Sequence, residues 1–222
     1  MKKDKFSIIC AMLFACLCMG LVDAVIQPGY LIKSIIKVFL FLLIPVVYSL
    51  VQKDRNIADL FQLRKHGLIF AAVCGIMIYV LILGAFLLLR DIFDFSALTG
   101  SLTATTGVSR QNYLLVALYI SFCNSFLEEF FFRGFGFLAL KKVSSRRFAY
   151  IFSAALFALY HIAMMIGWFD WTVILISLAG LFAGGIIFNY FNEKWNTLYP
   201  SWVIHMFANF ATNTIGAILF FA

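Results

Sequence analysis

Long, uncharged apolar runs alternate along the chain with short segments that hold most of the Lys and Arg residues. A helix needs about 20 apolar residues to cross the hydrocarbon core of a bilayer. Several runs come close to that length, and the pattern therefore predicts seven membrane spans. These runs are Phe6–Val25, Leu31–Val51, Leu68–Leu89, Tyr113–Leu140, Phe148–Ile166, Trp171–Phe191 and Thr197–Phe221.

The predicted spans are expected to be helices rather than strands of a barrel. Backbone N–H and C=O groups need partners inside a membrane, which leaves helices and closed barrels as the possible structures. Barrel strands alternate apolar and polar residues, whereas these runs are continuously apolar. No repeat or soluble domain interrupts the pattern. We therefore predict an all-α, polytopic transmembrane helical bundle, with residues 1–222 as a single membrane domain.

Composition agrees with this class of protein. Of the 222 residues, 64% are hydrophobic and only 12% are charged, whereas a soluble domain has about 25% charged residues. The apolar run after Met1–Lys5 has the outline of a signal peptide, but the many later spans favour an uncleaved first helix. A multi-pass protein of the cell membrane is the expected result.

The placement of positive charge predicts the orientation of the bundle, because cytoplasmic segments are enriched in Lys and Arg. Thirteen of the 17 Lys and Arg residues fall on the side of the N-terminus, and four, including Lys33 and Lys37, fall on the other side. The N-terminus is therefore predicted to be cytoplasmic. The formal net charge of +7 is assigned to this asymmetry and to lipid headgroups, not to a nucleic acid partner.

Two local patterns predict further structure. The segment Asn56–His66 carries apolar residues on one helical side and is expected to lie in the inner membrane interface as an amphipathic helix. In the sixth span, Gly180 and Gly184 form a small-xxx-small pair, and Gly185 follows, which indicates close helix packing.

Ionisable residues inside the apolar runs indicate where chemistry takes place. Of three His and three Glu residues, four lie within predicted spans: Glu128, Glu129, His161 and His205. A charged side chain in hydrocarbon costs about 2.5–3.5 kcal/mol on insertion scales, so these groups are expected to face one another. Counted from the inner ends of their spans, Glu128, His161 and His205 lie about 18, 20 and 12 Å deep. One polar site, open toward the cytoplasm, is predicted.

Residues four apart share a helix face, and three such pairs involve these ionisable groups. The pairs are Glu129 with Arg133, Phe157 with His161, and His205 with Asn209. An ion pair between Glu129 and Arg133 leaves Glu128 to act as a general base. Asn124 lies four residues before Glu128 and is equally compatible with a hydrogen bond to it and with simple packing.

These groups suit hydrolysis of an amide bond. His161 is placed to share a water molecule with Glu128, while His205 and Asn209 offer hydrogen-bond donors for a tetrahedral oxyanion. Zinc is the chemical alternative, since two His and one Glu with water in the fourth position form a catalytic zinc site. The chain has no HExxH motif, and the candidate ligands come from three separate spans. We expect no metal cofactor.

The same residues match the motifs of a known family. Glu128-Glu129-Phe-Phe-Phe-Arg133 resembles the EExxxR motif of the CPBP intramembrane proteases, also called the CAAX protease, bacteriocin-processing or Abi family. Phe157–His161 resembles the FxxxH motif of this family, and His205–Asn209 resembles its HxxxN motif. The motifs occur in the family's order, and the resemblance extends from about Leu115 to Thr214. It implies a glutamate-dependent intramembrane endopeptidase with a catalytic core at about residues 113–214.

The resemblance also implies roles and substrates. Glu128 and His161 correspond to residues thought to activate water, His205 and Asn209 to residues thought to stabilise the oxyanion, and Arg133 to an organising residue. Eukaryotic relatives trim prenylated CAAX proteins, whereas bacterial relatives act on peptides, process or resist bacteriocins, or support sensor systems. The short chain resembles the bacterial type. A peptide or membrane-associated protein is the expected substrate.

Two other functions remain open at this point. The chain could be a non-catalytic immunity or regulatory membrane protein that binds a bacteriocin or a sensor kinase. It could also be a proton-coupled transporter, since intramembrane Glu and His residues build proton relays. The transporter is disfavoured because no inverted repeat or pair of broken helices is visible in the sequence.

Overall fold

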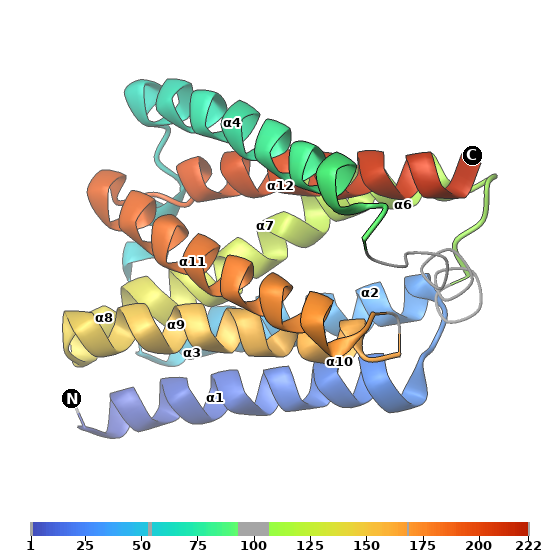
Figure 1. Ribbon diagram of the computed structural model, residues 1–222. Coiled ribbons are helices and arrows are strands. Elements are labelled where there is room, and N and C mark those ends of the chain that lie inside the picture. The colour runs from blue at the N-terminus through green and yellow to red at the C-terminus, as the bar shows by residue number, and fades with distance from the viewer. Residues whose placement is uncertain (1, 53–54, 93–106, 168, 222) are drawn as a thin grey trace.

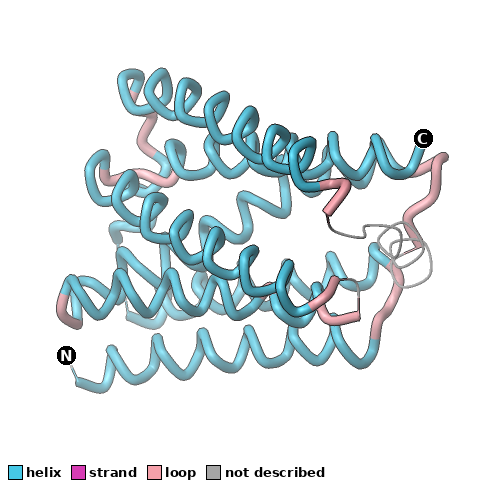
Figure 2. The backbone as a smooth tube through the Cα atoms, in the orientation of Figure 1, coloured by secondary structure: helices cyan, strands magenta, loops and turns pink. Residues whose placement is uncertain are grey.

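The structure is a computed structural model that describes residues 2–52, 55–92, 107–167 and 169–221. All regular elements within these ranges are helices, and no strand occurs among them (Figure 2). Seven helices are long and apolar enough to cross a membrane, which confirms the predicted all-α polytopic bundle. They are Lys3–Ile26, Tyr30–Val51, Lys65–Leu89, Tyr113–Val143, Arg146–Met165, Trp171–Trp195 and Tyr199–Phe221.

The first three spans form the N-terminal half of the chain. Helix α1 (Lys2–Leu21) continues into a π-helical turn, η1 (Val22–Ile26). The second span joins α2 (Tyr30–Val38), the π-helix η2 (Phe39–Leu43) and α3 (Ile44–Gln52), and the third is α4 (Lys65–Leu89). Helix α1 begins at the opposite end of the bundle from the end of the last helix, as an odd number of crossings requires (Figure 1).

The predicted amphipathic helix at Asn56–His66 is wrong. A short 3-10 helix, η3 (Arg55–Phe61), stands there instead, and the next helix starts at Lys65. The carbonyl of Leu60 accepts hydrogen bonds from the backbone N–H of Leu198 (2.9 Å) and from the hydroxyl of Thr197 (3.0 Å). Because a longer α-helix would need that carbonyl for its own next turn, these contacts end the helical segment early.

The fourth span is a continuous helix with two π-helical stretches. It joins α6 (Tyr113–Tyr119), η4 (Ile120–Asn124), α7 (Ser125–Glu128), η5 (Glu129–Ala139) and α8 (Leu140–Val143). Stretches of π-helix are uncommon and frequently occur at functional sites. Here they flank Glu128 on both sides.

Side chains of the last helix, α12 (Tyr199–Phe221), bind backbone carbonyls of the fourth span in and beside η4. The amide nitrogens of Asn213 and Asn209 donate to Ala117 and Ile120, each at 3.1 Å. The indole of Trp202 donates to the carbonyl of Phe122, also at 3.1 Å. These side-chain hydrogen bonds hold α12 against the fourth span in and beside η4.

The fifth and sixth spans pack closely together. Helix α9 (Arg146–Tyr160) is followed by the short α10 (Ile162–Met165), and α11 (Trp171–Trp195) crosses beside them. A Cβ atom added at Gly185 would lie 2.9 Å from the Cα of Ala154, whereas Gly180 and Gly184 have nothing within 4 Å of that position. The close packing expected of this segment therefore takes place at Gly185 and not at the Gly180–Gly184 pair.

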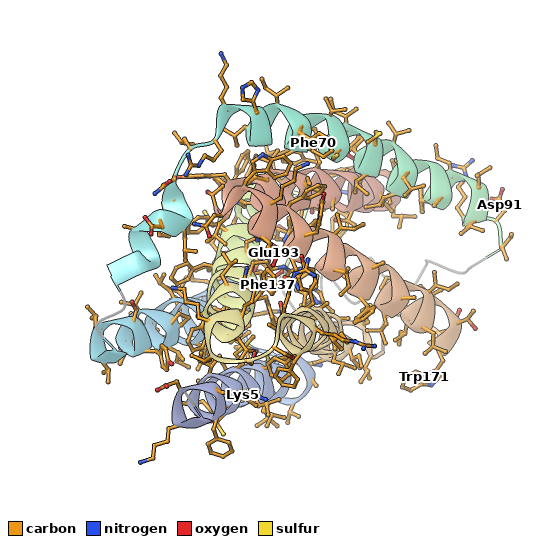
Figure 3. The ribbon with its side chains drawn as sticks, turned by 90° about the vertical axis from the view of Figure 1, so that its left-hand side faces the viewer. Lys5, Phe70, Asp91, Phe137, Trp171 and Glu193 are labelled. Atoms are coloured by element: carbon orange, nitrogen blue, oxygen red, sulfur yellow. The ribbon has the colours of Figure 1, made fainter. Side chains whose placement is uncertain are left out.

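Aromatic rings fill the interior, and an ionic cluster joins the helices at one end. The ring of Phe41 in η2 stacks on that of Phe131 in η5, with centroids 4.2 Å apart. Figure 3 views the bundle from the end where α1 begins and shows Glu193 and Phe137 close together between the helices. Glu193 accepts hydrogen bonds from Lys141, Arg146 and Tyr150 at 2.6–3.1 Å, which ties α8 and α9 to α11.

Candidate active site

Two adjacent buried glutamates form the centre of the site. Glu128 ends α7 and is 1% exposed, and Glu129 begins η5 and is 0% exposed. Successive helical residues point about 100° apart, so the two carboxylates face different neighbours. Each of them has its own cation, Arg133 for Glu129 and Lys37 for Glu128.

Glu129 belongs to a fully buried ionic group. Its Oε2 lies 3.5 Å from Nε of Arg133, so the predicted ion pair is present, and its Oε1 accepts a hydrogen bond from Nδ1 of His205 at 2.9 Å. The Arg133 guanidinium lies over the ring of Phe157, 3.9 Å from its centroid, and 5.0 Å from that of Phe188. Cation–π contacts of this kind partly replace the hydration that a buried cation loses.

The two carboxylate oxygens of Glu128 have different partners. Oε1 accepts a hydrogen bond from the amide of Asn124 (3.1 Å) and one from the ammonium of Lys37. The hydrogen bond between Asn124 and Glu128, which the sequence left open, is therefore present. Oε2 lies 3.9 Å from Nε2 of His161 and 3.6 Å from Nε2 of His205. Oε1 is thus the anchored oxygen, and Oε2 faces both imidazoles.

Lys37 was the residue that sequence reasoning missed. The count of positive charges assigns it to the outer side, whereas the structure places its side chain inside the bundle, 3% exposed. The available signal was its position seven residues into the apolar run Leu31–Val51. A cation at that depth needs a buried partner, and Glu128 was the candidate that lacked one.

Both histidines present the same nitrogen to Glu128. Nδ1 of His161 lies 2.7 Å from the carbonyl oxygen of Phe157, which only accepts, so Nδ1 carries the proton. Nδ1 of His205 donates to Glu129 in the same way. In neutral rings each Nε2 is then an acceptor directed toward Oε2 of Glu128. The Phe157 ring contacts both imidazoles edge to face, at centroid distances of 4.8 and 5.8 Å.

Asn209 lies one helical turn beyond His205, on the same side of α12. Its amide nitrogen donates to the carbonyl of Ile120 and thereby holds α12 against η4. The structure therefore brings His161 and His205 to the Oε2 atom of Glu128, whereas the side chain of Asn209 binds Ile120.

Within residues 2–52, 55–92, 107–167 and 169–221, no group of three or more His, Cys, Asp or Glu side chains is arranged to hold a metal ion. The cation in direct contact with Glu128 is the ammonium of Lys37.

The fold and the site define a multi-pass membrane protein with a buried cluster of ionisable side chains. Residues 110–211 match the family model described as type II CAAX prenyl endopeptidase Rce1-like, and this range contains all three motifs from Glu128 to Asn209. This match is consistent with the resemblance of the motifs to the CAAX protease (CPBP) family. Comparison with curated proteins and with solved structures gave no match. Lys37 lies outside the matched range.

Proposed function

We propose that this protein is an intramembrane endopeptidase of the cell membrane that hydrolyses a peptide bond in a peptide or membrane-associated protein. The observation that supports the proposal most directly is the contact between Oε2 of Glu128 and the Nε2 atoms of His161 and His205, all within 4 Å in a buried site. The match of residues 110–211 to the model of a protease family supports the same reaction class.

In the proposed first step, Glu128 acts as the general base. A water molecule bound to Oε2 is also within reach of Nε2 of His161, because the two atoms are only 3.9 Å apart. The water oxygen forms a bond to the carbonyl carbon of the substrate, and its proton passes to Oε2 of Glu128. His161, whose Nδ1 proton is held by the Phe157 carbonyl, accepts the second hydrogen bond from the water and orients it.

The tetrahedral intermediate carries a negative oxygen that needs hydrogen-bond donors. Protonated His205 donates from Nε2, while Glu129 accepts from Nδ1 and stabilises the imidazolium. An amide nitrogen has two N–H groups, and the bond from Asn209 to Ile120 uses one of them; the other is the proposed second donor. Glu128 then returns its proton to the leaving nitrogen, and the C–N bond breaks to give an acid and an amine.

We propose that this reaction proceeds without a metal cofactor. The positive charge that zinc would supply is provided in this site by Lys37 beside Glu128 and by Arg133 beside Glu129. Addition of a chelator to the assay below tests this point. A zinc-dependent enzyme would lose its turnover, whereas a metal-free enzyme would keep it.

The test uses the purified protein in lipid nanodiscs and internally quenched peptides. One probe is a farnesylated CAAX peptide, which the description of the matched family suggests, and the other is the same peptide without the farnesyl group. We expect cleavage by the wild type and a loss of about 10²–10⁴-fold in the Glu128→Gln variant, the range for a lost general base. Equal rates for the wild type and the Glu128→Gln variant would overturn the proposal. Loss of activity on addition of a chelator would overturn the statement that no metal is needed.

The same variant distinguishes the non-catalytic alternative. An immunity or regulatory protein that works by binding does not need a base at position 128. Complementation of a deletion strain by Glu128→Gln as complete as by the wild type would favour that alternative over proteolysis.

A further inference from the structure

Lys37 connects the N-terminal half of the chain to the catalytic group. Its ammonium donates to Oε1 of Glu128 and to Oδ1 of Asn124, the latter at 2.6 Å. The rings of Phe41 and Tyr160 lie 5.3 and 5.1 Å from Nζ and enclose it on other sides. The cation is thus held by groups from the second, fourth and fifth spans, and the residue is 3% exposed.

This contact balances the charge of an ionised Glu128. Adjacent buried carboxylates repel each other, and an isolated charge in a low-dielectric interior is neutralised by taking up or losing a proton. Arg133 forms its ion pair with Glu129, and the ammonium that pairs with Glu128 comes from α2. A protonated Glu128 could not accept a proton from water. The EExxxR motif supplies a cation for one glutamate, and in this chain α2 supplies the cation for the other.

Geometry adds a second effect. Rotation about the last side-chain bond of Glu is broad and two-fold, so a carboxylate without anchors can exchange its oxygens. Lys37 and Asn124 both bind Oε1, and this leaves Oε2 as the oxygen that faces His161 and His205. The two anchors therefore aim the basic oxygen at the place where water is activated.

We propose that Lys37 is a positioning residue of the active site, which keeps Glu128 ionised and directs its Oε2 toward the two histidines. This inference rests on the proposed peptidase function. It implies that the matched segment, residues 110–211, does not contain the whole active site, because α2 contributes a group on which Glu128 depends.

A merely structural ion pair is the competing explanation, and the chain offers a matched control for it. Lys33 lies one turn before Lys37 on α2 and pairs with Asp23 at 2.5 Å, and the Asp23 side chain is 1% exposed. Lys33→Met therefore also breaks an ion pair between a lysine and a buried carboxylate, but it leaves the ion pair of Glu128 intact. Lys37→Met and Lys37→Gln remove the charge, and Lys37→Arg retains it.

The first readout does not depend on substrate. Infrared spectra of each protein are compared with those of the same protein carrying Glu128→Gln, so that the difference isolates the Glu128 carboxyl group. At neutral pH we expect carboxylate bands in the wild type, Lys37→Arg and Lys33→Met, and a protonated carboxyl band in Lys37→Met and Lys37→Gln. An ionised Glu128 in both neutral variants would overturn the inference.

The second readout is turnover of the quenched peptides. We expect kcat to fall about 10²-fold or more in Lys37→Met, with KM little changed because Lys37 acts through Glu128. Lys37→Arg is expected to recover part of this loss, and Lys33→Met to retain wild-type kcat. Wild-type kcat in a folded Lys37→Met or Lys37→Gln variant would contradict the inference. A wild type that cleaves neither peptide while the infrared shift occurs would instead contradict the proposed function and leave the Lys37–Glu128 coupling supported.

Discussion

At the scale of single residues, the two glutamates of the motif differ in their partners rather than in their burial. Glu129 is bound by Arg133 and His205, from η5 and α12. Glu128 is bound at one oxygen by Lys37 and Asn124, while its other oxygen faces the imidazoles. This difference in partners is the reason why we propose Glu128, and not Glu129, as the general base.

Asn209 has two possible roles that substitution can separate. Asn209→Ala removes the hydrogen bond to the Ile120 carbonyl, which costs about 1 kcal/mol of stability. If its amide also binds the oxyanion, as we propose, kcat falls by about 10²–10³-fold as well. Thermal unfolding in detergent and peptide turnover measure the two effects.

Asn213 is the matched control for this prediction. It lies one turn further along α12 and donates to the Ala117 carbonyl and to the hydroxyl of Ser121, at 3.1 and 3.0 Å. Asn213→Ala should lose comparable stability but keep its kcat. Equal kcat in the two variants would assign Asn209 to helix packing alone.

The motif residues could be predicted from the sequence because ionisable side chains stand out in apolar runs and helical spacing shows which of them share a face. Lys37 could not be placed by the same reasoning. Counting of positive charges assigned it to the outer surface, and periodicity within one span does not tell which other span lies beside it. The contact between α2 and α7 depends on tertiary packing.

At the scale of elements, the fourth span shows how far hydrophobicity can predict structure. Its length and apolar character predicted a helix close to the observed one. They carry no signal for the π-helical stretches η4 and η5, nor for the hydrogen bonds by which Asn213 and Trp202 of α12 bind carbonyls in and beside η4. The 3-10 helix η3 was missed for a similar reason, since Leu198 and Thr197 bind its carbonyl at Leu60.

The contact between α9 and α11 gives a prediction at this scale. A side chain at Gly185 meets the backbone of Ala154, so Gly185→Ala should lower the stability of the bundle by about 1–3 kcal/mol through overpacking. Gly184→Ala is the control, because a Cβ there has nothing within 4 Å and alanine favours helix. Unfolding of the two variants in detergent checks the difference, and equal stability would contradict the observed packing.

At the scale of the whole molecule, the candidate site draws on four of the seven spans. The second contributes Lys37, the fourth both glutamates, the fifth His161 and the seventh His205. The family match begins at residue 110, so the N-terminal spans could be predicted as membrane helices but not as parts of the site. The ion pairs of this cluster also explain how charged groups can be buried inside the bundle, since each glutamate has a cation beside it.

The orientation of the bundle in the membrane is a prediction at this scale. Charge placement predicts a cytoplasmic N-terminus, and the helices α1 and α12 run between opposite ends of the bundle (Figure 1). In a bacterial host, a fluorescent protein fused to the N-terminus should fold in the cytoplasm, and alkaline phosphatase fused to the C-terminus should be active outside. The reverse pattern would contradict the predicted orientation and the cytoplasmic opening of the site.

The most direct measurement of the central claim compares new peptide ends in cells that express wild type, Glu128→Gln, Glu193→Gln or no copy. Mass spectrometry of membrane and secreted fractions gives the ends, and immunoblotting shows that each variant is present. Glu193 is the control, because it binds Lys141, Arg146 and Tyr150 away from the site. We predict one set of ends that appears only with the wild type and Glu193→Gln. The same ends in cells with Glu128→Gln would contradict a glutamate-dependent peptidase.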